Sequence, residues 1–131
     1  MRVIDSSILV KYFSREKGWE RARKYIVEGA ITLDLAIKEL SNVLWKKVLR
    51  DEIDPKLAVE IVEDIIREKP LIIEEETKYL VEAFEYSIKY KITIYDALFI
   101  VLAKNKNLEL VTADKKQAEV AEKIGIKTVI V

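Results

Sequence analysis

Four acidic side chains stand at positions from which they can act together: Asp5, Glu39, Asp96 and Asp114. Asp5 and Asp114 each follow a short apolar run that is typical of a strand, and Asp96 is the one charged residue in the stretch TIYDALFIVLA. Carboxylates packed within a few ångströms repel and desolvate one another, which raises their pKa values unless a cation neutralises them. Converging acids therefore indicate a divalent metal site, which can activate water for phosphodiester hydrolysis.

Three of these acids also have a purely structural interpretation. Asp5 and Asp114 are placed to cap the helices that follow their strands. Thr93 and Asp96 have the spacing of a capping box. This interpretation is weaker for Asp96, because the following segment 97–103 is apolar all round and so typical of a buried helix. An ionised acid at the mouth of a buried helix needs a partner, for which a cation is suitable.

Glu39 has the strongest structural alternative. It shares one helix face with Asn42 and Lys46, opposite the apolar side of the helix, and such a face is usually solvated. The helix directly follows an expected strand, however, so its first turns should lie near the sheet edge that carries Asp5. Taken together with the other acids, Glu39 is predicted to complete one acidic crevice.

The composition narrows the chemistry further. The 131-residue sequence contains neither Cys nor His. Disulfides, thiolate zinc sites, Cys nucleophiles and Ser-His-Asp catalysis are therefore excluded. Carboxylates without His suit hard cations such as Mg²⁺ or Mn²⁺.

The charge pattern bounds the partners and the location. The 23 basic and 23 acidic residues cancel, which argues against a protein that coats nucleic acid or membranes non-specifically. No uncharged run approaches the roughly 20 residues that span a bilayer. The N-terminus carries an acid at position 5 and resembles no signal peptide, so we expect a cytoplasmic protein. Solvated lysines and arginines are common, but Lys11, Arg15, Lys46, Lys115 and Lys116 are candidate phosphate contacts.

The elements that must position the acids alternate along the chain. We expect strands at 3–4, 31–33, 71–73, 109–112 and 128–131. Helices are expected from about 6, at 18–28, 34–51, 54–66 and 77–90, from 94 and at 115–124. Asp34 and Asp54 are the expected caps of two of them, and helix 77–90 carries Leu80, Ala83, Phe84 and Ile88 on one face.

This alternation predicts one α/β domain over residues 1–131, with three α/β/α layers and a central, mostly parallel sheet of four to five strands. In such sheets, ligands bind beyond the carboxyl ends of the strands. Asp5 and Asp114 are predicted at those ends.

At these residues the sequence resembles the PIN domain family, particularly the VapC-type toxin ribonucleases of type II toxin–antitoxin systems. The opening V-I-D-S-S-x-L-V around Asp5 is similar to the first-strand motif of that family. The segments E-L-S-N from Glu39, Y-D-A around Asp96 and L-V-T-A-D ending at Asp114 are similar to its other three motifs. The four motifs follow the order and spacing of that family, and the resemblance covers essentially the whole chain.

The resemblance implies an endoribonuclease that depends on Mg²⁺ or Mn²⁺ and cleaves single-stranded regions of RNA. The resemblance implies that Asp5, Asp96 and usually Asp114 hold metal, directly or through water. It implies that Glu39 completes this acidic metal pocket and helps to orient the attacking water. Three accessory polar positions correspond to Ser6, Asn42 and Thr112. The resemblance further implies a cognate antitoxin as partner and a homodimer.

Two other interpretations remain open on the residues alone. A receiver-like phosphoacceptor has a similar length and alternation, but it requires a phosphorylatable Asp after a middle strand, which is not evident here. A non-catalytic protein-binding domain would use all four acids as caps or solvated charges. Whichever of these functions the chain has, we expect Trp45 in the core or at a dimer contact.

Overall fold

The computed structural model describes residues 1–67 and 71–131. The strands are β1 (Arg2–Ile4), β2 (Ala30–Leu33), β3 (Leu71–Glu74), β4 (Leu110–Thr112) and β5 (Thr128–Ile130). The helices are α1 (Ser6–Phe13), α2 (Trp19–Val27), α3 (Asp34–Leu49), α4 (Pro55–Arg67), α5 (Leu80–Tyr90), α6 (Ile94–Lys106) and α7 (Lys115–Lys123), with a short 3₁₀ helix η1 (Glu76–Tyr79) before α5.

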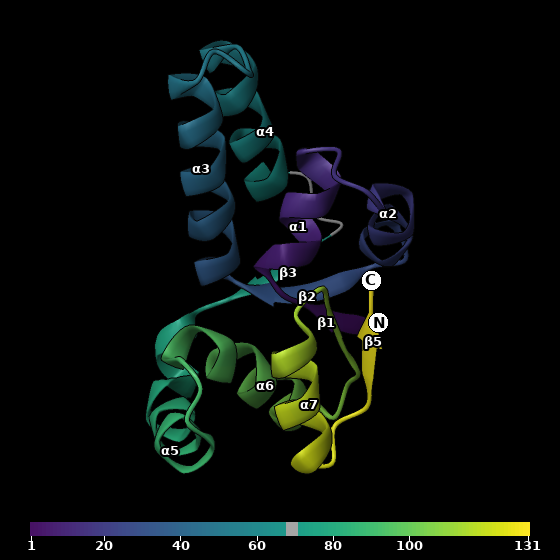
Figure 1. The fold of residues 1–131 in the computed structure, drawn as a ribbon, viewed down its shortest axis with the longest axis vertical. Coiled ribbons are helices and arrows are strands. Elements are labelled where there is room, and N and C mark those ends of the chain that lie inside the picture. The colour runs from purple at the N-terminus through teal and green to yellow at the C-terminus, as the bar shows by residue number, and fades with distance from the viewer. Residues whose placement is uncertain (68–70) are drawn as a thin grey trace.

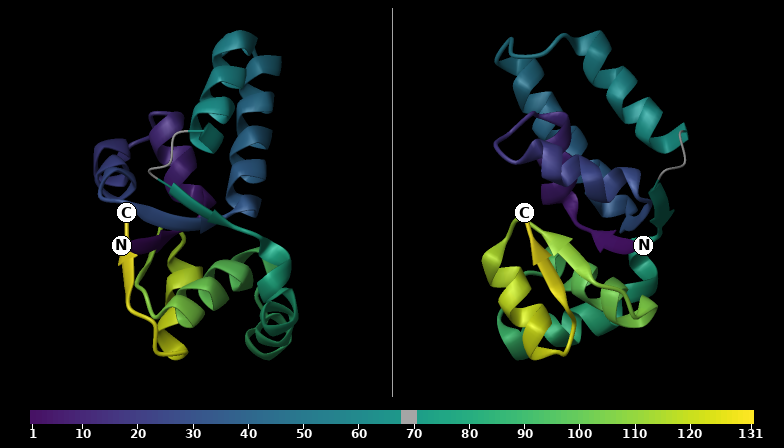
Figure 2. Two further views of the ribbon diagram at one scale, coloured as in Figure 1. Left: turned by 180° about the vertical axis from the view of Figure 1, so that it is seen from behind. Right: turned by 90° about the vertical axis from the view of Figure 1, so that its right-hand side faces the viewer.

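The strands form one parallel sheet in the order β3-β2-β1-β4-β5. Helices α1 to α4 lie on one side of this sheet, and α5, α6 and α7 lie on the other (Figures 1 and 2). The predicted three-layer α/β/α class is therefore confirmed. Parallel strands need crossover connections, and the alternation of helices with strands in the sequence provides them.

The order in which the strands are added to the sheet reverses at β1, which lies in the middle of the sheet. The chain proceeds from β1 to β2 and β3 on one side and returns to β4 and β5 on the other. Val3 lies beside Leu110 and Ile4 beside Val111, so the carboxyl ends of β1 and β4 are neighbours. The edge position of β3 also differs from the 2-1-3-4-5 order of receiver domains, which argues against the receiver-like alternative.

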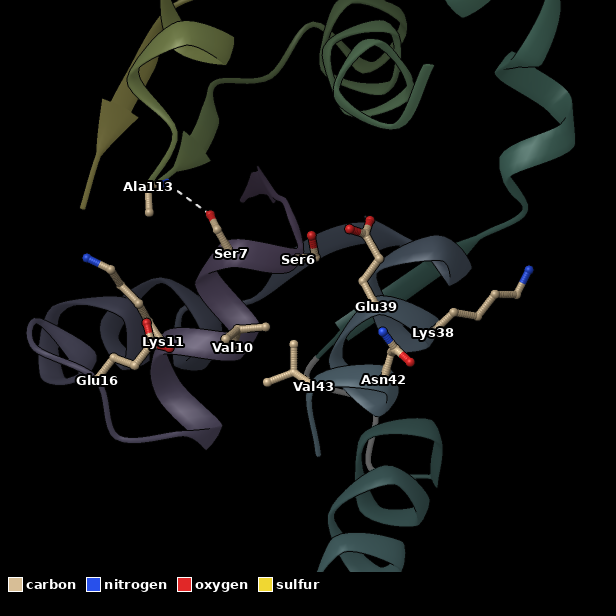
Figure 3. Close-up of a pocket in the computed structure, with 10 residues that line it drawn as sticks. All are labelled: Ser6, Ser7, Val10, Lys11, Glu16, Lys38, Glu39, Asn42, Val43 and Ala113. Atoms are coloured by element: carbon tan, nitrogen blue, oxygen red, sulfur yellow. Dashed lines mark hydrogen bonds between the residues drawn. The ribbon is translucent and has the colours of Figure 1, made fainter. Parts of the chain in front are cut away.

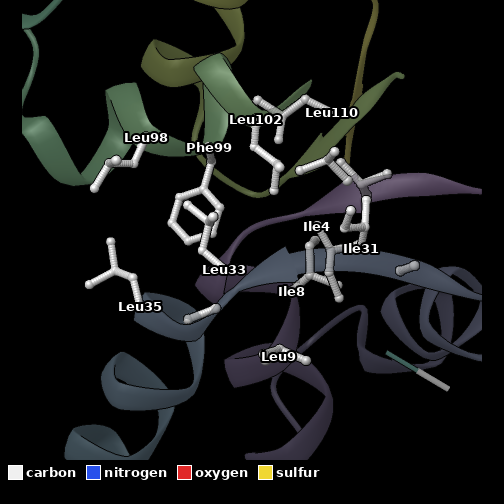
Figure 4. Packing of buried hydrophobic residues seen from close by; sticks show 14 of the residues in the cluster. Ile4, Ile8, Leu9, Ile31, Leu33, Leu35, Leu98, Phe99, Leu102 and Leu110 are labelled. Atoms are coloured by element: carbon white, nitrogen blue, oxygen red, sulfur yellow. The ribbon is translucent and has the colours of Figure 1, made fainter. Parts of the chain in front are cut away.

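The core holds the helix that carries Asp96. All seven residues from Ala97 to Ala103 are buried, as the apolar stretch predicts. Phe99 and Leu102 of this helix lie near Ile4 and Leu33 of the sheet (Figure 4). Because residues 97–103 of α6 are packed on all sides, the turn before them is held in a defined place at the sheet edge.

Of the two helix caps expected at Asp34 and Asp54, the structure forms one. Asp54 caps α4 as predicted, by accepting the Lys56 N–H at 2.7 Å. Asp34, in contrast, is the first residue of α3 and not its cap, and its Oδ1 accepts the N–H of Glu76 at 3.1 Å. A contact between distant parts of the chain has taken the place of the local cap.

The apolar face of α5 is only partly buried. Ala83 is fully buried, whereas Phe84 and Ile88 are 52% and 66% exposed. Trp45 is 55% exposed on α3, so it does not belong to the core of the chain. Among the helices of the described ranges, none is long and apolar enough to cross a membrane.

Candidate active site

Asp5 joins β1 to α1 and is 4% exposed. Its Oδ1 accepts the Ser7 hydroxyl and the Ile8 N–H, which makes Asp5 the N-cap of α1 as predicted. Its Oδ2 accepts the hydroxyl of Thr112 at the end of β4. Burial raises the pKa of Asp5 to about 6 against the lowering effect of these three hydrogen bonds, and the charge of Asp96 adds to the rise.

Thr112 connects Asp5 to a residue that sequence reasoning missed. Its single hydroxyl hydrogen has two acceptors within reach, Asp5 Oδ2 and, at 2.8 Å, Gln117 Oε1. The Thr112 oxygen also accepts the N–H of Asp114 at 3.0 Å. Gln117 is 1% exposed, and its spacing from Val120 and Ala121, which are both buried, was the signal in the sequence that placed it on the inner face of α7.

Asp96 lies in the first turn of α6 and is half-buried. Thr93 is the N-cap, since its hydroxyl oxygen accepts the Asp96 N–H at 3.2 Å. In the described part of the chain, no backbone N–H donates to the Asp96 carboxylate, so only half of the predicted capping box is formed. Burial raises the pKa of Asp96, as does the charge of Asp114, while Thr93 and Lys116 oppose the rise.

Replacement of Thr93 by Ala is expected to destabilise the fold by about 1 kcal/mol, because the first turn of α6 loses its capping oxygen. Asp96→Asn keeps the backbone N–H that Thr93 accepts and should not show this loss. Urea denaturation at pH 7 in EDTA compares the two variants with the wild type. If Asp96→Asn lost as much stability as Thr93→Ala, the carboxylate of Asp96 would be a capping group after all.

Glu39 points toward the same region from α3. Burial raises its pKa, the nearby Ser6 hydroxyl lowers it, and the charges of Asp96 and Glu76 raise it further. Its Oε1 is buried and accepts no hydrogen bond from any residue that the structure describes. A buried carboxylate oxygen without a donor requires a ligand or water.

A hollow of about 450 Å³ adjoins these acids between α1 and α3. Figure 3 shows Ser6 and Glu39 side by side at its upper edge and Lys11 and Lys38 at opposite ends. Of the four predicted acids, Glu39 alone lines it. Asp5 is connected to it through Ser7, a lining residue.

The remaining predicted residues lie at the rim. Asp114 is exposed and caps α7 by accepting the N–H groups of Lys116 and Gln117 at 2.9 and 3.2 Å. Asn42 is exposed and lines the hollow. Lys11 also lines it, with its Nζ donating to the Val131 carbonyl at 2.8 Å.

The donor set fits a hard divalent cation, although the side chains do not enclose one in this conformation. Within residues 1–67 and 71–131, no three acidic side chains are grouped closely enough to hold an ion. The charge of Asp96 nevertheless raises the pKa of both Asp5 and Glu39, and that of Asp114 raises the pKa of Asp96. The four carboxylates therefore share one electrostatic neighbourhood, and in it the Glu39 Oε1, which accepts no hydrogen bond within the described ranges, is an oxygen of the kind that hard cations bind.

In this parallel sheet the order of the strands reverses at β1, and acidic side chains surround the carboxyl ends of β1 and β4. The protein is therefore an α/β domain with a carboxylate site at its topological switch point. The family model of the PIN domain matches residues 2–123. The chain belongs to the PIN domain family.

Individual relatives agree with this assignment. The chain is 30% identical over 120 residues to Ribonuclease VapC3 of Pyrobaculum aerophilum, covering 89% of this chain and 92% of that protein. The crystal structure of PAE2754 from the same organism superimposes with a TM-score of 0.71 at 22% identity, over 98% of this chain and 83% of that one. A toxin–antitoxin complex from Klebsiella pneumoniae gives a TM-score of 0.61 at 18% identity, over 90% of each chain. The structural likenesses show the shared fold.

Proposed function

We propose that this protein is a metal-dependent endoribonuclease that uses Mg²⁺ or Mn²⁺, with Asp5, Glu39, Asp96 and Asp114 as its catalytic acids. The observation that carries the proposal is the electrostatic coupling of the acids at the switch point of a PIN domain, where the charge of Asp96 raises the pKa of Asp5 and Glu39 and the charge of Asp114 raises that of Asp96. The name of the relative Ribonuclease VapC3 supports RNA as the substrate.

The residues divide the work according to how each is held. Asp5 is fixed through both carboxylate oxygens by Ser7, Ile8 and Thr112, which suits a rigid metal ligand. Asp96 and Asp114 complete the negative field beside it. When bound, a divalent ion supplies a water of lowered pKa and neutralises charge on the phosphate. Glu39 Oε1, which has no donor among the described residues, is available to accept a hydrogen bond from the attacking water.

The hollow lies where an RNA strand can approach these acids. Lys11 and Lys38 stand at its two ends and offer positive charge to phosphates on either side of the scissile bond (Figure 3). Ser6 and Asn42 line the hollow between them and can donate to the sugar or phosphate. Lys38 is paired with Glu76 at 2.8 Å and must exchange that partner for a phosphate.

We further propose that the protein is the toxin of a toxin–antitoxin pair, with a cognate antitoxin as partner and a homodimer as its assembly. The toxin–antitoxin complex among the structures of the same fold supports the antitoxin. The exposed apolar side chains Val81, Phe84 and Ile88 on α5 support a second copy of the chain as their cover.

Purified wild-type protein is expected to cleave labelled single-stranded RNA in the presence of Mg²⁺ or Mn²⁺, and excess EDTA should stop the cleavage. Gel analysis of end-labelled oligonucleotides of mixed sequence measures both results. Asp64→Asn is the matched control, since it removes an exposed carboxylate on α4 outside the site and should cleave like the wild type. Cleavage that persists unchanged in EDTA would refute the metal-dependent mechanism.

A further inference from the structure

Gln117 is a buried polar side chain that none of the predicted roles uses. It is the only Gln of the sequence and is 1% exposed on α7. Its Nε2 donates to the backbone carbonyl of Asp96 at 3.1 Å, and its Oε1 accepts from the Thr112 hydroxyl at 2.8 Å. One amide therefore connects the first turn of α6 to the end of β4.

The orientation of this amide follows from its two partners. The Asp96 carbonyl can only accept, so the amide nitrogen of Gln117 must face it. The amide oxygen then faces Thr112, whose hydroxyl also contacts Asp5. Gln117 thus reaches Asp96 through the Asp96 backbone carbonyl and the carboxylate of Asp5 through one hydroxyl.

The backbone of α7 ties the same residue to the third acid of the cluster. The Gln117 N–H donates to Asp114 Oδ1 at 3.2 Å, as part of the cap of that helix. The Thr112 oxygen accepts the Asp114 N–H at 3.0 Å. Gln117 and the Thr112 hydroxyl beside it are therefore in contact with all three acids: with the carboxylate of Asp5, the backbone carbonyl of Asp96, and the backbone N–H and carboxylate of Asp114.

We propose that Gln117 is a positioning residue that sets the separation of Asp5, Asp96 and Asp114 and so prepares the site for a divalent ion. The carboxylates repel one another, and a cluster of like charges spreads unless other contacts hold its parts in place. A neutral amide that donates to one part and accepts from another does this without adding charge. Residues that orient metal ligands typically contribute about 10- to 100-fold to metal affinity or activity.

This inference rests on the metal site of the proposed function, and its test reads the metal directly. Gln117→Met keeps the length of the side chain but cannot donate to Asp96, and its sulfur accepts from Thr112 far more weakly than an amide oxygen does. We expect it to weaken Mn²⁺ binding to the purified full-length protein by about tenfold or more, measured by titration with electron paramagnetic resonance detection of free Mn²⁺.

Val120→Ala is the matched control, because Val120 is a buried residue of the same helix that has no polar side-chain atom. It should lower the melting temperature and leave the Mn²⁺ affinity within twofold of the wild type. Should Gln117→Met not fold, Gln117→Asn is judged by the same criterion, since its shorter side chain cannot span both partners.

Three outcomes would overturn the inference. Equal Mn²⁺ affinity of Gln117→Met and wild type would make Gln117 a purely structural residue. An equal loss of affinity in Val120→Ala would show that loosening of α7 is sufficient. Absence of Mn²⁺ binding to the wild type would overturn this inference together with the metal dependence of the proposed function, whereas the first two outcomes leave that function intact.

Discussion

Replacement of Asp5 by Asn is expected to lower RNA cleavage by a hundredfold or more while making the folded protein more stable at pH 7. The loss of activity is expected because Asp5 is a rigidly held ligand of the metal ion that we propose. The gain in stability follows from the burial of Asp5, which is 4% exposed and has its pKa raised to about 6. A variant that loses function yet gains stability distinguishes a functional acid from a structural one.

The sign of the stability change depends on pH. In the unfolded chain Asp5 ionises near its ordinary pKa of 3.8, and in the folded protein it ionises only near 6. The folded state therefore holds this proton more tightly, and stability falls as the pH rises from about 4 to above 6. A shift of this size corresponds to about 3 kcal/mol at pH 7 and to well under 1 kcal/mol at pH 4.

Asn fits the surroundings of Asp5 without leaving a polar group unpaired. The side-chain oxygen can accept from Ser7 and Ile8 as Oδ1 does now. The amide nitrogen can donate to the Thr112 oxygen, and the Thr112 hydrogen then goes to Gln117 Oε1. The substitution removes a buried charge and conserves the hydrogen bonds, so the folded protein should become more stable.

Urea denaturation in EDTA at pH 7 and pH 4 measures this effect. Asp5→Asn should exceed the wild type by up to about 3 kcal/mol at pH 7, and the difference should nearly vanish at pH 4. The exposed-site control Asp64→Asn should show no such pH dependence. A lower stability of Asp5→Asn at pH 7 would mean that its capping hydrogen bonds outweigh the cost of burying its charge.

Addition of Mn²⁺ is expected to stabilise the wild-type protein by about 2.7 kcal/mol at a concentration one hundred times the dissociation constant. In the site that we propose, the ion binds the assembled carboxylates of the folded state, which the unfolded chain cannot provide. Asp96→Asn should lose most of this stabilisation, because the charge of Asp96 is the one that perturbs both Asp5 and Glu39.

Thermal denaturation with increasing MnCl₂ tests this expectation, with NaCl of equal ionic strength as the control for general screening. Screening would also relieve repulsion among the acids, but at equal ionic strength a monovalent salt would screen as a divalent one does. An equal rise in melting temperature with NaCl would remove the case for a specific site. If Mn²⁺ stabilised Asp96→Asn as much as the wild type, Asp96 would not be a ligand of the ion.

Much of the fold followed from local patterns. The alternation of apolar runs with helical periodicities predicted a parallel sheet between two layers of helices. The all-apolar segment 97–103 predicted a buried helix. Asp5 and Asp114 were recognised as caps because a cap depends on residues two or three positions along the chain. Periodicity and capping are short-range effects, so a sequence displays them directly.

The exposure of helix faces did not follow from those patterns. The apolar spacing of α5 is that of a core helix, yet Phe84 and Ile88 remain exposed. Hydrophobic periodicity shows that a helix has an apolar face but does not show what covers it. The same holds for Trp45 on α3.

The sequence by itself determined the chemistry that we propose for the site: acids after strands and no His or Cys, which predict oxygen ligands for a hard cation. Tertiary structure alone decided how those acids are held. The contact between Thr112 and Asp5 spans 107 positions, and that between Gln117 and Asp96 spans 21. Desolvation, which raises the pKa of Asp5 to about 6, likewise belongs to no residue or spacing. It arises only when the sheet and both helical layers close around the carboxylate and exclude water.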